Sequence, residues 1–291
     1  MNPEAAPQLL ALLCSMSYAS ALVSSRLGLR HSTPTTVTLV SILVQNSTLW
    51  TSVFLTGGIP AVAPTAIAMI SIVGIFQLGV RLFAYTGVLK IGASRSSTLQ
   101  SISPLVSATI AIAFLGETTT LLIVAGTFMV IAGVVLVSWK AEREVAGFRR
   151  RYLLLPVGAA CLTGMNHPMR RYALGLSNEP LFFAAFMGLI SLLGFLFYMG
   201  WAPSKEPLVW NRQALGPFLS TGIFETLSLV LIISAISIGP VVVVAPIAAS
   251  YPVWALIGAK LFLRGVEKIT FKTVLGILSV VAGTAAIHLG K

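Results

Sequence analysis

The chain has 291 residues, of which 56% are hydrophobic and only 9% are charged. An ordinary soluble domain has about a quarter of its residues charged, so this composition excludes a soluble globular fold and indicates a protein embedded in a lipid bilayer. The formal net charge is +11. The cations stand singly or in small groups between long apolar runs, which is not the continuous basic patch that nucleic-acid binding requires.

Ten apolar runs have about the length of a membrane-spanning helix. A bilayer core about 30 Å thick needs roughly 20 apolar residues of helix to cross it. The run that comes first is preceded by Glu4 and by no Lys or Arg, so it lacks the basic region of a cleavable signal peptide and is expected to remain as a helix. We therefore predict an all-α integral membrane protein with ten transmembrane helices, at residues 5–25, 34–56, 65–89, 94–115, 118–139, 152–172, 181–201, 214–237, 240–263 and 269–289.

Positive charge is distributed unevenly between the two sides of this arrangement. Of the 19 Lys and Arg residues, 15 fall on the side reached after odd-numbered helices. Arg81 falls inside a helix, and only Arg170, Arg171 and Lys291 fall on the opposite side. Because basic loops are retained in the cytoplasm, we predict a multi-pass protein of the plasma (inner) membrane with its basic loops cytoplasmic and both termini outside.

The two halves of the chain resemble each other. An offset of 147 aligns Cys14 with Cys161, and an offset of 148 aligns Gly74 with Gly222. Five spans separate equivalent positions, so the second half would cross the membrane in the opposite sense, as in transporters with inverted repeats. The alternative is a chance recurrence of Gly and Pro in apolar helices. We predict one five-helix repeat at 1–139, a basic loop at 140–151 and a second five-helix repeat at 152–291.

Short motifs recur in the same order in both halves. Ser103-Pro104-Leu105 leads to Leu115-Gly116-Glu117 and then to IVAGTFMVIAG at 123–133, and a looser copy runs from Ala245-Pro246 to VLGILSVVAG at 274–283. Over essentially the whole chain, this pattern resembles the EamA-type branch of the drug/metabolite transporter superfamily. The resemblance implies a ten-helix basket whose central cavity is lined mainly by helices 1, 3, 4, 6, 8 and 9, with helices 5 and 10 in support. Members of this family move small metabolites, amino acids, amines or drugs, usually outward and often with protons. Their termini are often assigned to the cytoplasm, so the charge distribution here is a departure.

Glycines and one acidic residue in these motifs have a structural interpretation. Gly126 and Gly133 are seven residues apart, as are Gly276 and Gly283, so each pair lies on one helix face and predicts close helix packing. Glu117 is expected at the start of the fifth helix, where the helix dipole favours a carboxylate. The two cysteines, Cys14 and Cys161, are interpreted as buried structural thiols.

Glu225 stands near the middle of the helix expected at 214–237. A carboxylate at this depth costs about 2.5 to 3.5 kcal/mol on insertion scales. It is a candidate for binding a substrate ammonium group or for carrying a coupling proton. The alternative is a hydrogen bond or ion pair that bridges two helices.

Arg81 lies in the helix expected at 65–89, one turn after Gln77. The repeat alignment sets Gln77 opposite Glu225, so both are candidates for one cavity. Arg81 could bind a substrate carboxylate with two parallel hydrogen bonds. Alternatively, it neutralises Glu225 or extends to the membrane interface.

The Asn166-His167-Pro168 sequence places polar groups inside the sixth expected helix. Pro168 lacks a backbone donor and predicts a local break. His167 is a candidate proton relay, with a packed histidine as the alternative. Two further candidates for substrate binding are Gln100 and Tyr251, and the candidate hinges are Pro104, Pro168, Pro246 and Pro252.

Nucleotide-binding and metal-ligand spacings are absent from the sequence. We predict a secondary active transporter that exports a small metabolite, such as an amino acid or an amine, by alternating access, with protons as the candidate coupling ion. A flippase for a lipid-linked substrate and an intramembrane enzyme are the alternatives. The expected partners are a small-molecule substrate and the lipid bilayer, with no nucleic acid and no cofactor, and the chain is expected to be a monomer or homodimer.

Overall fold

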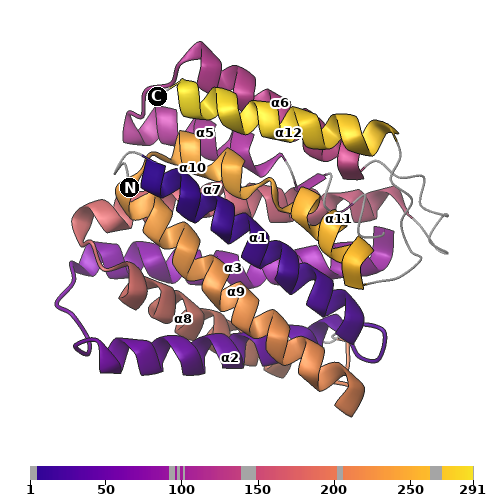
Figure 1. Cartoon of the computed structure of the whole chain (residues 1–291). Helices are drawn as coiled ribbons and strands as arrows, with labels where there is room; N and C mark the ends of the chain where they lie inside the picture. Colours follow the sequence, from indigo (N-terminus) through magenta and orange to yellow (C-terminus); the bar gives the residue numbers. More distant parts are fainter. Residues whose placement is uncertain are drawn as a thin grey trace.

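The computed structural model describes residues 5–91, 96, 99–100, 102–138, 149–201, 206–262 and 271–290, and these residues contain helices but no strand. Figure 1 shows the helices as a bundle. In chain order they are α1 (Ala6–Gly28), α2 (Pro34–Leu55), α3 (Pro64–Ile91), α5 (Ser103–Leu115), α6 (Leu121–Ser138), the 3-10 helix η2 (Arg150–Leu153), α7 (Leu154–Leu176), α8 (Pro180–Trp201), α9 (Arg212–Ile238), α10 (Val241–Ala248), α11 (Tyr251–Phe262) and α12 (Phe271–Leu289).

Five of the described helices are long and apolar enough to cross a membrane, namely α1, α2, α3, α8 and α9. Four shorter apolar segments accompany them, at Ser103–Leu115, Leu121–Leu136, Val241–Ala255 and Val274–Leu289. The outside of the bundle carries large apolar side chains, such as Phe114 and Leu121, which are each 84% exposed. Such a surface is suited to lipid rather than water.

The helix expected at 240–263 is interrupted, which corrects the sequence prediction. Ala249 and Ser250 form a turn between α10 and α11. Pro252 explains the interruption because it has no N–H group and its ring would clash with the carbonyl of Ala248 in a continuous helix. The helix expected at 94–115 lies partly outside the described residues, and its described part includes α5.

The break predicted at Pro168 does not occur, since α7 continues from Leu154 to Leu176 with Pro168 inside it. A proline leaves the carbonyl four residues earlier without its helical partner. That carbonyl belongs to Gly164, and it accepts a hydrogen bond of 3.0 Å from Oγ of Ser107 in α5. A neighbouring helix therefore satisfies the group that the proline frees.

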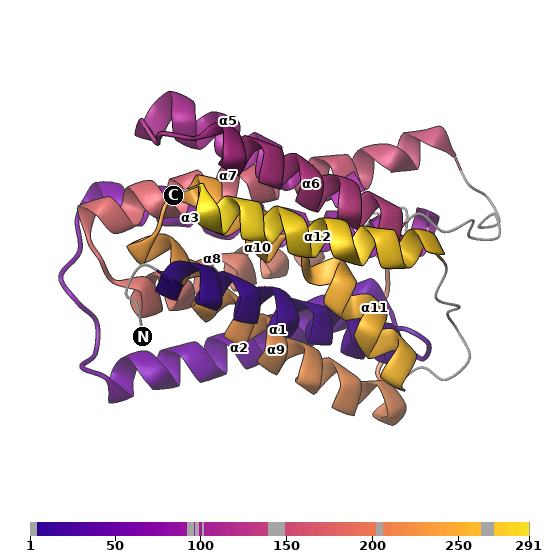
Figure 2. The same cartoon turned by 45° about the horizontal axis from the view of Figure 1, so that its top comes forward.

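Three helix pairs dominate the packing: α6 with α12, α1 with α9, and α3 with α7. The α6–α12 pair lies along one edge of the bundle, at the top in Figure 1 and turned toward the viewer in Figure 2. A Cβ atom at Gly126 would lie 2.6 Å from the carbonyl oxygen of Gly283, and one at Gly133 would lie 2.6 Å from that of Gly276. The close packing predicted from the glycine spacing is confirmed, because only glycine permits the two backbones to approach so closely.

Candidate functional site

A cavity of about 160 Å³ lies inside the bundle. All seven side chains predicted to bind substrate line it: Gln77, Arg81, Gln100, Asn166, His167, Glu225 and Tyr251. The other lining residues are Cys14, Tyr18, Val80, Ser103, Thr163, Arg170, Ser228, Leu229, Ile232, Ala245, Ala248 and Ala249. Of these described lining residues, none belongs to α2, α6, α8 or α12, which agrees with the lining expected from the family resemblance.

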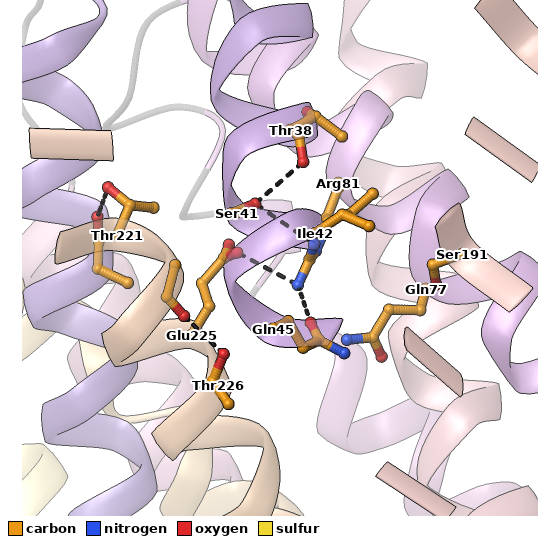
Figure 3. A network of polar contacts seen from close by, with 12 residues as sticks. Thr38, Ser41, Ile42, Gln45, Gln77, Arg81, Ser191, Thr221, Glu225 and Thr226 are labelled. Carbon is orange, nitrogen blue, oxygen red and sulfur yellow. Dashed lines mark hydrogen bonds and ion pairs between the residues drawn. The ribbon is translucent and has the colours of Figure 1, made fainter. Parts of the chain in front are cut away.

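Arg81 and Glu225 form a buried ion pair between α3 and α9 (Figure 3). The distance from Nη2 of Arg81 to Oε2 of Glu225 is 3.2 Å, and the two residues are 6% and 8% exposed. The mutual neutralisation considered in the sequence analysis is therefore the arrangement in this structure. Burial makes the pair sensitive to the loss of either partner, because the remaining charge would be left in an apolar interior.

Helix α2 completes the surroundings of Arg81, a contribution that the sequence analysis missed. Nη2 of Arg81 donates to Oε1 of Gln45 at 2.5 Å, and Nη1 donates to Oγ of Ser41 at 3.3 Å (Figure 3). Thr38, Ser41 and Gln45 form a polar stripe at spacings of three and four along α2, a helix expected to span the membrane. This stripe could have indicated that α2 faces a polar partner inside the bundle.

Tyr85 contacts the same carboxylate and was also missed. Its hydroxyl donates to Oε1 of Glu225 at 2.7 Å, and it lies one helical turn after Arg81. Glu225 is thus approached at one oxygen by a phenol and at the other by a guanidinium. The spacing of Arg81 and Tyr85 on α3 would have indicated that both face the same neighbour.

Arg170 corrects the predicted distribution of cations, because it was counted among the charges of the opposite membrane side but is part of the cavity wall. It is 4% exposed and lies within α7. Its Nη2 atom donates a hydrogen bond to Oε1 of Gln77. Arg170 is four residues after Asn166 and three after His167, so all three share one face of the helix, and this spacing could have identified it.

Three atoms on this face of α7 are buried and have no hydrogen-bond partner: Oδ1 of Asn166, Nδ1 of His167 and Nε of Arg170. Buried polar groups in native structures nearly always have a partner. A row of unpartnered polar atoms beside a cavity is therefore typical of a ligand site.

An aromatic pair closes another part of the cavity wall. The rings of Tyr18 in α1 and Tyr251 in α11 meet edge to face, with their centroids 4.9 Å apart.

Gln100 and the two cysteines have different surroundings. The side-chain amide of Gln100 donates to Oγ of Ser96 at 3.1 Å. Cys14 is buried beside the cavity, with its Sγ atom 3.2 Å from Oγ of Ser228, whereas Cys161 is exposed, which corrects the interpretation of both cysteines as buried.

The candidate hinge prolines lie at different kinds of position. Pro104 lies at the start of α5, and Pro246 lies inside α10. Pro252 begins α11 with Tyr251, and Pro168 lies in the unbroken α7. Three of the four therefore lie in or beside the short helices α5, α10 and α11, which contribute to the cavity wall.

Glu117 caps a helix other than the one expected. Its carboxylate oxygens accept hydrogen bonds from the backbone N–H groups of Val241 at 2.9 Å and Val242 at 3.0 Å. These are unpaired donors at the start of α10. The Glu117 carboxylate therefore interacts favourably with the dipole of α10 and not with that of the helix expected at 118–139. This contact joins the first half of the chain to the second.

Arg171 also binds backbone groups. Its Nη1 atom donates to the carbonyl oxygens of Ile236 and Ser237 at 2.7 and 3.1 Å, at the end of α9. Both Arg170 and Arg171 therefore lie within α7 and bind neighbouring groups.

Within the described part of the chain, no group of three or more His, Cys, Asp or Glu side chains could hold a metal ion.

The helical bundle, its apolar surface and its buried polar cavity define a class: integral membrane proteins that enclose a site for a small molecule. The family follows from the sequence comparison, in which the model of the EamA-like transporter family matches residues 6–139 and again residues 150–289. The chain belongs to this family of the drug/metabolite transporter superfamily.

A solved crystal structure, described only as that of a protein, has the same fold. It is 15% identical to this chain, with a TM-score of 0.77, and the match covers 96% of this chain and 95% of the other. No match was found among curated proteins.

Proposed function

We propose that the protein is a secondary active transporter that exports a small metabolite by alternating access. The observation that carries the proposal is the buried Arg81–Glu225 pair, which joins the two segments matched by the family model across one polar cavity. A contact of this kind links the relative positions of α3 and α9 to the charge state of the site.

We infer further that ten spans form two inverted five-helix repeats, at 1–139 and 152–291, around the basic loop at 140–151. The glycine contacts between α6 and α12 support this inference. The offset of 150 converts the pair Gly126–Gly283 into the pair Gly276–Gly133, so exchanging the two halves reproduces the contact. The start of α1 and the end of α12 lie at the same end of the bundle (Figures 1 and 2), as an even number of spans requires.

Glu225 is the first candidate for proton coupling and His167 is the second. Protonation of Glu225 would remove the charge that holds Arg81 at 3.2 Å, and it would allow α3 and α9 to separate. His167 lines the same cavity and has an unpartnered Nδ1 atom, which supports it as the second candidate.

Flux through proteoliposomes tests the proposal. The full chain is expected to catalyse substrate flux driven by a pH gradient, and Glu225→Gln is expected to abolish the pH-driven component while substrate exchange persists. Unchanged pH-driven flux in Glu225→Gln would remove the proton role from this residue, and His167→Asn would then be examined. Absence of any saturable flux would overturn the transporter proposal.

The proposed orientation has its own test. Arg170 lies in the cavity wall, so it no longer counts among the cations of the opposite side, and the asymmetry on which the prediction depends becomes stronger. We expect the basic loops in the cytoplasm and both termini outside. Single cysteines added at each terminus should react with an impermeant thiol reagent in intact cells, and protection of both until lysis would reverse the assignment.

A further inference from the structure

We propose that Arg170 binds a carboxylate of the transported molecule, so that the substrate is a small organic carboxylate. The inference rests on the proposed transport function and specifies its substrate class. It follows from the charges in the cavity and from the hydrogen-bonding capacity that remains unused there.

The charges lining the cavity do not balance. Among the described residues that line it, Arg81 and Arg170 are cationic and Glu225 is the acidic residue. Glu225 is already bound by Arg81, at 3.2 Å, and by the Tyr85 hydroxyl, at 2.7 Å. Arg170 is therefore left with a neutral amide, that of Gln77, as its hydrogen-bond partner.

A cation buried in this way is unfavourable unless an anion reaches it. Arg170 is 4% exposed, and its Nε atom has no hydrogen-bond partner. A guanidinium presents parallel N–H donors that match the two oxygens of a carboxylate. Because the cavity admits only a small molecule and its described lining residues supply no second carboxylate, the matching anion belongs to the ligand.

The remaining unpartnered atoms indicate where the rest of the molecule lies. Oδ1 of Asn166, one turn before Arg170, is a free acceptor and suits a donor group such as the ammonium of an amino acid. Leu229, Ile232 and Ala248 supply an apolar wall. A simple cationic amine would lack the carboxylate and would add charge beside Arg170, which like-charge repulsion disfavours.

Matched ligand sets test the assignment on the full-length protein purified in detergent at pH 7. One set is leucine, leucinamide, isopentylamine and 4-methylpentanoate; a second is phenylalanine, phenylalaninamide, phenethylamine and 3-phenylpropionate. Thermal unfolding followed by tryptophan fluorescence reports binding, because a ligand that binds the folded state raises the melting temperature. Radiolabelled counterflow in proteoliposomes reports transport.

Carboxylate-bearing members of at least one set should raise the melting temperature and be exchanged, whereas the amide and amine of that set should not. Comparison of the amino acid with its deaminated acid then distinguishes a zwitterionic substrate from a simple carboxylate. Arg170→Gln should weaken carboxylate binding by about thirtyfold or more, as truncating one partner of a buried charge pair does. Arg170→Lys keeps the charge without the paired donors and should fall in between.

Arg171→Gln is the matched control, since it removes the adjacent arginine, which binds the end of α9 and does not line the cavity. It should leave the preference for acid over amide unchanged. Binding of amides or amines as tight as that of the acids, or unchanged acid binding in a folded Arg170→Gln, would overturn the inference while leaving transport itself in place. Failure of every probe to bind or exchange would instead count against the proposed function and the inference together.

Discussion

Nη2 of Arg81 in α3 lies 3.2 Å from Oε2 of Glu225 in α9, inside the cavity between the two segments matched by the family model. Ser41 and Gln45 of α2 and Tyr85 of α3 hold the two partners. Because the pair is buried, losing one partner would leave the charge of the other uncompensated in an apolar interior.

Removing one member of this pair should destabilise the fold more than removing both. A single charge left in an apolar interior typically costs about 3 to 5 kcal/mol, whereas a neutral pair avoids that penalty. We expect Arg81→Gln and Glu225→Gln each to lower the free energy of unfolding, with a coupling energy of at least about 1 kcal/mol in the double variant. Reversible unfolding in mixed micelles measures the free energy of unfolding of the two single variants and the double variant, with substitution of the exposed Glu179 by Gln as control. Additive effects would contradict the prediction.

Glu117, which lies between α5 and α6, should stabilise the start of α10. Glu117→Ala removes the acceptor for the first N–H groups of α10, and loss of such a cap typically costs about 1 kcal/mol. Because α10 contributes Ala245 and Ala248 to the cavity, substrate flux should fall as well. The same substitution at Glu179, which is exposed and precedes α8, should leave flux unchanged. Wild-type flux and stability in Glu117→Ala would show that the cap does not position α10.

The hydrogen bond from Ser107 to Gly164 should matter because of Pro168. Ser107→Ala leaves the Gly164 carbonyl without its partner, and we expect a loss of about 1 kcal/mol. Pro168→Ala supplies a backbone N–H for that carbonyl, so adding Ser107→Ala to it should have almost no effect. Thr109→Ala removes an exposed hydroxyl from the same helix and serves as control. An equal loss in both backgrounds would refute the explanation.

The glycines at which α6 contacts α12 should not accept a larger residue. Gly126→Ala would place a Cβ atom 2.6 Å from a backbone oxygen of Gly283, and overpacking of this kind typically costs about 1 to 3 kcal/mol. Gly216→Ala is the matched control, since a Cβ atom there meets nothing within 4 Å and should be neutral or slightly stabilising. Thermal unfolding measures the melting temperatures of the two variants. Equal melting temperatures would contradict the prediction that Gly126→Ala is the less stable one.

Hydropathy was sufficient to locate most of the helices, because burial in lipid demands long apolar segments whatever the packing. The same local chemistry identified Arg81, Glu225, Asn166 and His167, since polar groups are rare at that depth. Glycine spacing likewise predicted the α6–α12 contact, because residues seven apart on a helix share a face. Each of these inferences depends only on the period of one helix and the solvent around it.

The continuity of the helices and the pairing of the charges depend on contacts between helices, which only the tertiary structure shows. Pro168 does not break α7, whose freed carbonyl accepts a hydrogen bond from a hydroxyl of α5, whereas a turn at Ala249 and Ser250 separates α10 from α11 before Pro252. Arg170 was counted among the cations of the opposite membrane side because it stands near the end of the helix expected at 152–172, where the sequence does not show whether a side chain faces the interface or a cavity. Which carboxylate an arginine meets depends on helices distant in sequence, so only the tertiary structure paired Arg81 with Glu225 and left Arg170 beside a neutral amide.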